Sequence, residues 1–433
     1  MRSKPARALA VAVLLLLTGC LPQGPSVPST PTVTPLPPSS PTTTPTATPT
    51  LPRPLVTTLV LWVPEELSPY AETEAAALLA QRLEAFNQSQ NDLQVETLIK
   101  KAHGRGGLLD FLRTASIAAP SVLPDLVVLD LDDLRVAAQA GLLQPMDGLL
   151  PADWVEDLYP FAVEMGRVGE QMVGVPLGVE VEHVAYWPAL YSTPPVTWTA
   201  VLSAGVPFVF PAGGREGIVD DTTLIEYLGA GGRLTDAEGN PSLDEEPLTA
   251  VLDFYARGVA AGVISPSTTL AITGTEGCWQ ALLNGQAGIG TVDSRRFWTA
   301  PDLGLVPAPL PSRSGRAVTL ARGWTIGLVA SDAERQKQAM ELLMWLFTPE
   351  GYGPWTQSLG YLPTRRGGLA AWTVDEPSRT FLETLLEGAR AAPDQSVRKA
   401  VGPALQQAVE AVLTGRRTPA EAARRATEAV AQP

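Results

Sequence analysis

The 433-residue sequence has few of the side chains that hold metals or form disulfides. It contains only two histidines, His103 and His183, and two cysteines, Cys20 and Cys278. These are too few for a zinc site built from cysteine and histidine or for a framework of disulfides. We therefore expect no metal and no cofactor.

Positive charge and long apolar runs are also scarce. The 31 Lys and Arg are outnumbered by 45 Asp and Glu, which gives a formal net charge of -14 at pH 7. This balance excludes a general binder of nucleic acids or of anionic membranes. The uninterrupted apolar run at residues 8–17 is shorter than the ~20 residues that a membrane-spanning helix needs. We expect the rest of the chain to lie outside the membrane.

The first twenty residues have the pattern of a bacterial lipoprotein signal peptide. Three basic residues precede the apolar run of residues 8–17. The sequence Leu-Thr-Gly-Cys follows at residues 17–20 and resembles a lipobox, whose cysteine receives a diacylglyceryl group before the signal is cleaved. Residues 1–19 are therefore the predicted signal peptide. Cys20 is predicted to carry the lipid and to anchor the protein on the extracytoplasmic side of the cell membrane.

Residues 20–54 are predicted to be this anchor and an extended linker. Residues 21–54 contain 12 Pro and 13 Ser or Thr among 34. Such a composition cannot build a hydrophobic core and is typical of a polyproline-like stalk. The remaining residues are enough for two domains of about 150 residues or more.

From residue 55 the pattern becomes that of an α/β protein. Apolar runs predict strands at residues 59–63, 93–99 and 126–129. Amphipathic stretches between them predict helices at 68–87 and 106–118. This alternation is typical of a parallel sheet with helices. A second α/β region is predicted from strands at 173–181 and 206–210 and helices at 222–229 and 247–261. Near the end, the pattern predicts a strand at 319–329 and helices at 332–347, 378–390, 398–414 and from 418.

Nine short segments of this body carry a resemblance to a known family. They read TLVLW from residue 58, PDLVV from 124, AGLL from 140, GVPLGVE from 174, PVTW from 195, LNGQAG from 283, GWTIG from 323, FTPEG from 347 and LTGR from 413. In this order, and behind a lipobox, they resemble the extracellular solute-binding lipoproteins of ABC importers, family 1, which include maltose-binding and other sugar-binding proteins.

The resemblance implies an α/β fold of the periplasmic-binding-protein type, with two lobes joined by a hinge and a cleft between them. Lobe 1 is expected at 55–178 plus about 320–355, and lobe 2 at about 179–315 plus about 360–433. It further implies a non-enzymatic monomer that captures a small solute, with a sugar or oligosaccharide as the leading candidate. The solute would be delivered to the transmembrane subunits of an ABC permease. Nucleic acid is not expected as a partner.

Several acidic residues are candidates for contact with the solute. Carboxylates accept hydrogen bonds from the paired hydroxyls of sugars. By resemblance, the turn after the first strand contributes Glu65 and Glu66, and the segment after the strand at 126–129 contributes Asp130, Asp132 and Asp133. The alternative is that these charges stabilise the N-termini of helices.

Four further candidates follow from the resemblance. Glu180 lies where maltose-binding proteins have a glutamate that contacts the ligand. Trp298 and Trp324 are candidates to stack on a sugar ring, and the alternative for both is a place in the core. Arg295 occupies a position where maltose-binding proteins have a stacking aromatic residue. This departure argues against maltodextrin itself as the solute.

Two other classes of function stay open at this stage. A lipoprotein glycoside hydrolase needs two carboxylates about 5–10 Å apart, and Asp130 and Glu180 are candidates for such a pair. The second class is a surface adhesin, which would show no response to a small molecule.

Overall fold

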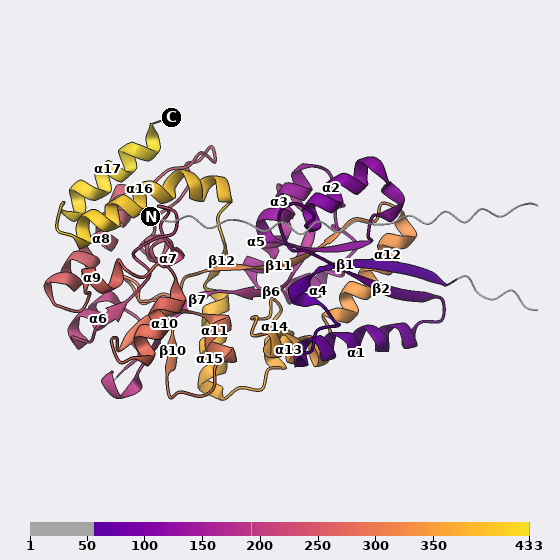
Figure 1. The fold of residues 1–433 in the computed structure, drawn as a ribbon, viewed down its shortest axis with the longest axis horizontal. Helices are drawn as coiled ribbons and strands as arrows, with labels where there is room; N and C mark the ends of the chain where they lie inside the picture. The colour runs from indigo at the N-terminus through magenta and orange to yellow at the C-terminus, as the bar shows by residue number, and fades with distance from the viewer. Residues whose placement is uncertain (1–55, 192, 433) are drawn as a thin grey trace, which may run out of the picture. The chain divides into compact units, whose positions relative to one another are not determined.

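The computed structural model describes residues 56–191 and 193–432 (Figure 1). The predicted signal peptide, Cys20 and the linker lie outside the described residues. Among the helices within these two ranges, none is both long enough and apolar enough to cross a membrane.

Three parallel strands form one half of the first sheet. β1 (Thr57–Pro64) pairs in parallel with β2 (Leu93–Lys100) on one side and with β3 (Leu126–Asp130) on the other. α1 (Glu74–Ser89) and α2 (Leu108–Ala118) connect these strands. The predicted alternation of strands and helices is confirmed, because the apolar runs are the buried strands of a parallel sheet.

The helix that we expected from Ser68 begins later, at Glu74. Its N-cap is Thr73, whose hydroxyl accepts a hydrogen bond from the amide of Ala76 at 3.1 Å. Directly after β1, residues Glu65–Leu67 form a separate 3-10 turn, η1. The two candidate glutamates therefore lie on this turn and not in the first turn of α1.

Two long antiparallel strands and a short one complete the first sheet. β11 (Thr319–Leu328) pairs antiparallel with β3 and with β6 (Gly174–Glu180), while β12 (Ala389–Ala391) pairs in parallel with the start of β11. The register of β11 on β3 sets Trp324 opposite Asp130.

The second sheet has the strand order β10-β7-β9-β8. These strands are β7 (Glu182–Tyr186), β8 (Phe208–Val209), β9 (Ile289–Asp293) and β10 (Val306–Ala308). Only Val181 separates β6 of the first sheet from β7 of the second. The chain therefore passes from one sheet to the other within a single residue.

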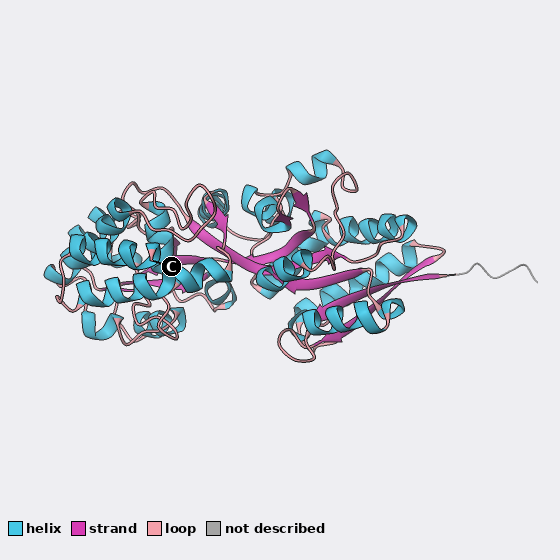
Figure 2. Ribbon diagram, turned by 90° about the horizontal axis from the view of Figure 1, so that it is seen from above, coloured by secondary structure: helices cyan, strands magenta, loops and turns pink. Residues whose placement is uncertain are grey.

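Helices cover the strands on both sides (Figure 2). Those grouped with the first sheet are α3 (Leu131–Gln139), α4 (Ala152–Glu156), α5 (Pro160–Gly166), α12 (Ala333–Leu346), α13 (Pro349–Leu359) and α14 (Arg366–Ala370). Those grouped with the second are α6 (Trp198–Ala204), α7 (Asp221–Gly229), α8 (Glu245–Ala260), α9 (Pro266–Thr269), α10 (Thr275–Leu283), α11 (Ser294–Thr299), α16 (Gln395–Leu413) and α17 (Pro419–Ala431). α15 (Glu376–Glu387) contacts both α5 and β10. The helices predicted near the end of the chain are confirmed.

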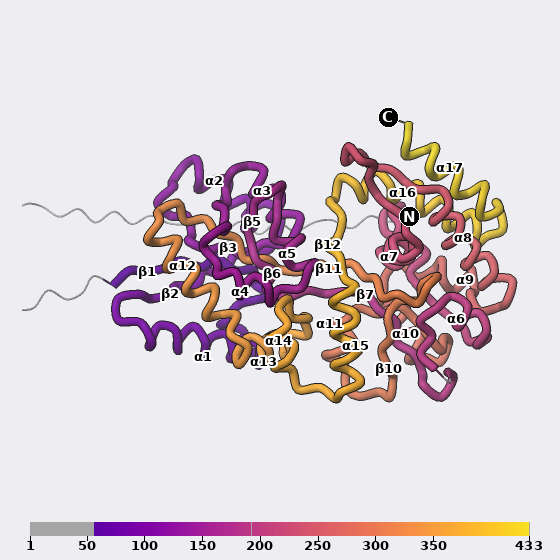
Figure 3. Tube along the Cα trace, turned by 180° about the vertical axis from the view of Figure 1, so that it is seen from behind, coloured from indigo at the N-terminus to yellow at the C-terminus, as the bar shows by residue number. Residues whose placement is uncertain are grey.

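Two large apolar cores underlie this arrangement. The first includes side chains of β1, β3, β6 and β11 together with α1, α12 and α13. Figure 3 shows α1, from the start of the body, beside α12 and α13, which follow more than 200 residues later. The second core includes β7, β8 and β9 with α7, α8, α16 and α17. Residues 361–372 contribute Tyr361, Leu362 and Trp372 to the first core. The lobe boundaries given above stay a prediction.

Candidate functional site

Polar side chains gather where strands of both sheets end. Glu66 follows β1, and Asp130 is the last residue of the parallel neighbour β3. Glu180 ends β6. In the second sheet, Asp293 ends β9 and is followed by Arg295 on α11. The carboxyl ends of strands are where open α/β sheets bind ligands.

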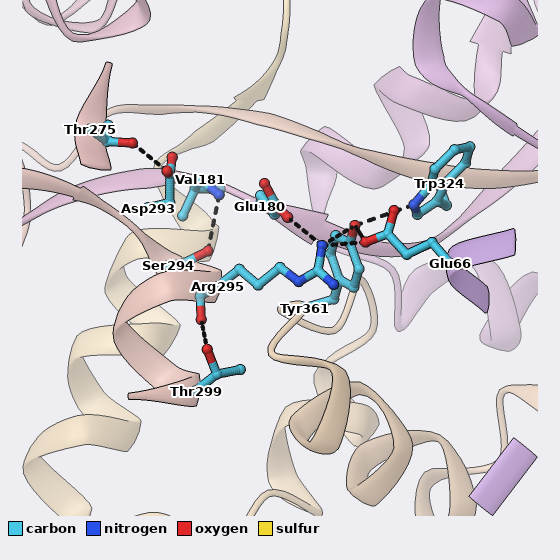
Figure 4. Close-up of polar contacts among 10 residues, drawn as sticks. All are labelled: Glu66, Glu180, Val181, Thr275, Asp293, Ser294, Arg295, Thr299, Trp324 and Tyr361. Atoms are coloured by element: carbon cyan, nitrogen blue, oxygen red, sulfur yellow. Dashed lines mark hydrogen bonds and ion pairs between the residues drawn. The ribbon is translucent and has the colours of Figure 1, made fainter. Parts of the chain in front are cut away.

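Arg295 connects Glu66 with Glu180 (Figure 4). Its Nη1 donates to the carboxylate of Glu66, lies 3.3 Å from Oε1 of Glu180 and donates to the hydroxyl of Tyr361 at 3.1 Å. That hydroxyl donates to Glu66 at 2.9 Å and accepts a bond from Nε1 of Trp324 at 3.2 Å. We call Glu66, Glu180, Arg295, Trp324 and Tyr361 the Arg295 cluster. It joins residues from the ends of both sheets.

The opposite charges within the Arg295 cluster stabilise each other's ionised forms. Burial raises the pKa of Glu180, and the charge of Arg295 opposes this shift. Burial lowers the pKa of Arg295. Tyr361 and the carboxylates of Glu66 and Glu180 together raise this pKa by more than burial lowers it, so the net shift is upward. The guanidinium therefore stays charged between its acidic neighbours.

Tyr361 is a member of the cluster that the sequence reasoning missed. It follows Gly360, which ends α13 with a φ of 75°. A Cβ at this glycine would lie 2.5 Å from Thr299 Cγ2 and 3.2 Å from the carbonyl oxygen of Arg295. The glycine thus permits α13 to end against α11. An aromatic residue directly after a helix-ending glycine was the available signal.

The start of α11 is also tied to the chain between the two sheets. The amide of Ser294 donates to the carbonyl of Val181 at 2.8 Å, and the amide of Val181 donates to Oγ of Ser294 at 3.1 Å. Figure 4 shows this pair next to Asp293, which accepts a hydrogen bond from Thr275. The residue that precedes Arg295 is therefore fixed to the crossing between the sheets.

Trp324 has a place in both the cluster and the core. It is 8% exposed and belongs to the first apolar core. Its ring is stacked on that of His103, with the centroids 5.8 Å apart and the planes 14° apart. His103 is a second residue at this site that we did not predict as a contact.

The three predicted aspartates lie together at the start of α3. Asp130 is the N-cap, with Oδ1 accepting from the amide of Asp133 at 2.7 Å. Asp132 lies 3.9 Å from Arg135. Burial raises the pKa of Asp130 and of Asp132. One carboxylate oxygen of Asp130 thus caps the helix, as the alternative expected. The other oxygen lies 3.4 Å from Nδ1 of His103.

Glu65 and Trp298 lie apart from these contacts. Glu65 is exposed on η1. Trp298 packs edge-on against Trp372, with ring centroids 6.1 Å apart. It lines a cavity of about 760 Å³ together with Phe297 and Phe381, and no member of the Arg295 cluster lines this cavity.

A second charged group, between β11 of the first sheet and the start of α7, was not predicted. Arg322 forms a bidentate ion pair with Asp221 at 2.6 and 2.9 Å, and Arg398 lies 2.9 Å from the same carboxylate. Nearby, burial raises the pKa of Glu182 well above its usual value and that of Asp220 to about 7. Both carboxylates accept from the hydroxyl of Thr222, at 2.7 and 3.1 Å.

Comparison with known proteins identifies the family of this chain. The family model described as bacterial extracellular solute-binding protein matches residues 81–376. The chain belongs to this family. It is a solute-binding protein of ABC transport and not an enzyme, which excludes the glycoside hydrolase. No curated protein matches its sequence significantly.

Solved structures show the same fold as this solute-binding protein. The cyclic α-maltosyl-1,6-maltose binding protein of Arthrobacter globiformis is 20% identical and aligns over 87% of this chain and 98% of its own, with a TM-score of 0.69. The sugar-binding protein MalE of Xanthomonas citri has the same identity and coverage, with a TM-score of 0.67. A family 1 solute-binding protein of Alicyclobacillus acidocaldarius is 16% identical and aligns over 87% and 98%, also at 0.67. The predicted α/β fold of the periplasmic-binding-protein type is confirmed.

Proposed function

We propose that this solute-binding protein takes a sugar or oligosaccharide between the carboxyl ends of its two sheets and delivers it to the transmembrane subunits of an ABC permease. The observation that carries the proposal is the Arg295 cluster. It offers carboxylates that can accept hydrogen bonds from pairs of hydroxyls, and the indole of Trp324 for the C–H face of a sugar. Its members Glu66 and Arg295 follow strands of different sheets, since Glu66 lies on η1 after β1 and Arg295 lies on α11 after β9. A solute that replaces their contact would touch both halves of the protein.

We propose the two lobes with the boundaries predicted from the sequence and a hinge that closes them on the solute. Hinge closure around a ligand is an established two-state device. The proposed ligand-binding residues are Glu65, Glu66, Asp130, Asp132, Glu180, Arg295, Trp298 and Trp324. Trp298 lines a cavity beside Phe297, apart from the Arg295 cluster.

The class of solute is supported by the structural neighbours. MalE3 of T. maritima was solved with maltose, and a cyclo/maltodextrin-binding protein was solved with maltotetraose. In this chain the side chain at position 295 is an arginine that pairs with two carboxylates. We therefore propose a sugar other than a plain maltodextrin, one whose hydroxyls or charged groups replace these hydrogen bonds.

We propose further that the protein works as a monomer tethered through lipid-modified Cys20. The apolar run, the lipobox and the proline-rich linker support this proposal. The linker would place the sugar-binding body at a distance from the membrane surface that holds the permease.

A thermal-shift screen of the full chain in detergent, with a panel of mono- and oligosaccharides, tests the proposal. A ligand present at 100 times its Kd stabilises the folded state by about 2.7 kcal/mol. We expect such a shift with at least one sugar, without any change in the sugar itself. Glu180→Gln should reduce the shift, and Glu170→Gln, an exposed residue of another loop, should leave it intact. No shift with any sugar would contradict the sugar assignment and favour a solute of another class.

A further inference from the structure

Three side chains with metal-binding atoms converge beside Trp324. Nδ1 of His103 lies 3.4 Å from Oδ2 of Asp130 and 3.4 Å from Oδ2 of Asp133. All three atoms lie within 4.8 Å of one another. His103 comes from the segment between β2 and α2, and the two aspartates come from the first turn of α3. The group is thus assembled from two separate parts of the chain.

The two separations from His103 Nδ1 match the edges of a tetrahedral metal site. Zinc binds imidazole nitrogen at about 2.0–2.1 Å and carboxylate oxygen at about 2.0–2.2 Å. With tetrahedral angles, two such ligand atoms lie about 3.4 Å apart. An imidazole ligand favours zinc and related first-row ions, whereas calcium and magnesium take oxygen ligands.

Two of the three side chains, those of Asp130 and His103, make further contacts that hold them in place. Oδ1 of Asp130 accepts the amide of Asp133 at 2.7 Å, which turns Oδ2 toward His103. The imidazole of His103 is stacked on Trp324. Its own segment is closed by a bond from the amide of Gly106 to Oδ2 of Asp110 at 2.8 Å. Ligand atoms that are held by packing lose less freedom when a metal binds.

The balance of charge at this place is incomplete without a cation. Within residues 56–432, His103 is the only basic side chain that forms an ion pair with Asp130 or Asp133. The nearest arginine on the helix, Arg135, pairs with Asp132 and with Asp394 instead. Two carboxylates therefore face a single basic group, and a divalent ion between them would neutralise both.

We propose that His103, Asp130 and Asp133 bind one divalent first-row metal ion of the zinc type. The side chains are 55%, 35% and 25% exposed, so an ion reaches them from solvent and keeps a fourth position for water or another oxygen ligand. Of its three ligands, only Asp130 is also proposed as a sugar contact, so substitutions of His103 and Asp133 test this site separately.

Calorimetric titration of the metal-free full chain with zinc chloride, without sugar, tests the site. We expect saturable binding of one ion, and a loss of affinity of about 100-fold or more in His103→Gln and in Asp133→Asn. Because the His103 side chain is largely exposed, His103→Gln should melt at the wild-type temperature in the absence of metal. Asp153→Asn, an exposed carboxylate on α4, serves as the control and should bind zinc normally.

Cobalt(II) gives a second measurement, because a tetrahedral cobalt site absorbs visible light much more strongly than an octahedral one. We expect this absorption in the wild-type protein and its loss in His103→Gln. The proposal is overturned if no saturable zinc binding is found, or if His103→Gln binds zinc as tightly as the wild type. Neither result would bear on sugar binding, which the thermal-shift screen measures separately.

Discussion

The guanidinium of Arg295 lies over the ring of Tyr361, with its carbon 4.6 Å from the ring centroid, although the residues are 66 positions apart. Arg295 is on α11 beside the second sheet, and Tyr361 belongs to the first apolar core. The contact therefore joins the two halves of the body. A cation on an aromatic face contributes about 0.5–2 kcal/mol, depending on its exposure to water.

Tyr361→Phe separates the ring from its hydroxyl. The ring under Arg295 remains, but the hydrogen bonds with Glu66, Trp324 and Arg295 are lost. We expect the free energy of unfolding to fall by about 1–2 kcal/mol, measured by chemical denaturation. Tyr70→Phe is the matched control, since Tyr70 is 71% exposed, and should have no effect. Equal stability of the two variants would mean that the hydroxyl contributes nothing.

Arg295→Ala removes the side chain through which α11, beside the second sheet, contacts Glu66, Glu180 and Tyr361 at the end of the first sheet. In the absence of solute, we expect the two halves to separate more readily and the radius of gyration from small-angle X-ray scattering to increase. A sugar identified by the thermal-shift screen should decrease the radius in the wild-type protein. A radius that is the same for wild type and variant, with and without sugar, would indicate a rigid binder.

Trp324→Ala removes a large side chain that is only 8% exposed. We expect a loss of about 3 kcal/mol or more in the free energy of unfolding, because a cavity forms in the first core. If the indole also stacks on the sugar, the affinity of the folded variant should fall roughly tenfold. Calorimetric titration next to the melting curve measures both quantities. Normal affinity with the expected loss of stability would place Trp324 in the core alone.

Glu226 gives the protein a dependence on pH. The residue is buried and accepts a hydrogen bond from Tyr255, and burial raises its pKa to about 8. A raised carboxyl pKa contributes stability that is complete below about pH 4.5 and is lost as the pH rises through 8. Glu226→Gln should therefore melt a few degrees above the wild type at pH 8.5 and close to it at pH 5. Glu170→Gln is the exposed control, and a variant that gains nothing at pH 8.5 would contradict the assignment.

Cys20→Ser tests the membrane anchor. Without the thiol that accepts the lipid, the protein should leave the membrane fraction for the soluble extracytoplasmic fraction. The measurement is fractionation of the producing cells followed by immunoblotting of the body. Full retention in the membrane would rule out Cys20 as the anchor.

Local patterns predicted the long strands of the first sheet but not β7, β9 and β10 of the second. Contacts between distant segments were harder still to predict. The run at 126–129 marked β3 because four buried apolar residues in a row fit only a strand covered on both faces. Its last residue, Asp130, was correctly placed at the carboxyl end of the sheet. The pairing of Trp324 with Asp130 depends on the register of β11, a strand about 200 residues later, and nothing near either residue encodes it.

The missed members of the site have the same explanation. His103 carries no local motif and Tyr361 has only the preceding Gly360 as a signal, and each reaches the site through a turn that contains glycine. The start of α1 was misplaced because two residues, Ser68 and Thr73, both suit an N-cap. The choice between them depends on how the chain leaves β1 through η1.

The reciprocal hydrogen bonds between Val181 and Ser294 couple the crossing between the two sheets to the start of α11. Val181 is the single residue at which the chain leaves one sheet for the other, and Ser294 begins the helix that carries Arg295. A rotation of the backbone at Val181 would therefore rotate α11 as well. Val181 and the side chain of Arg295 would then move as one rigid unit.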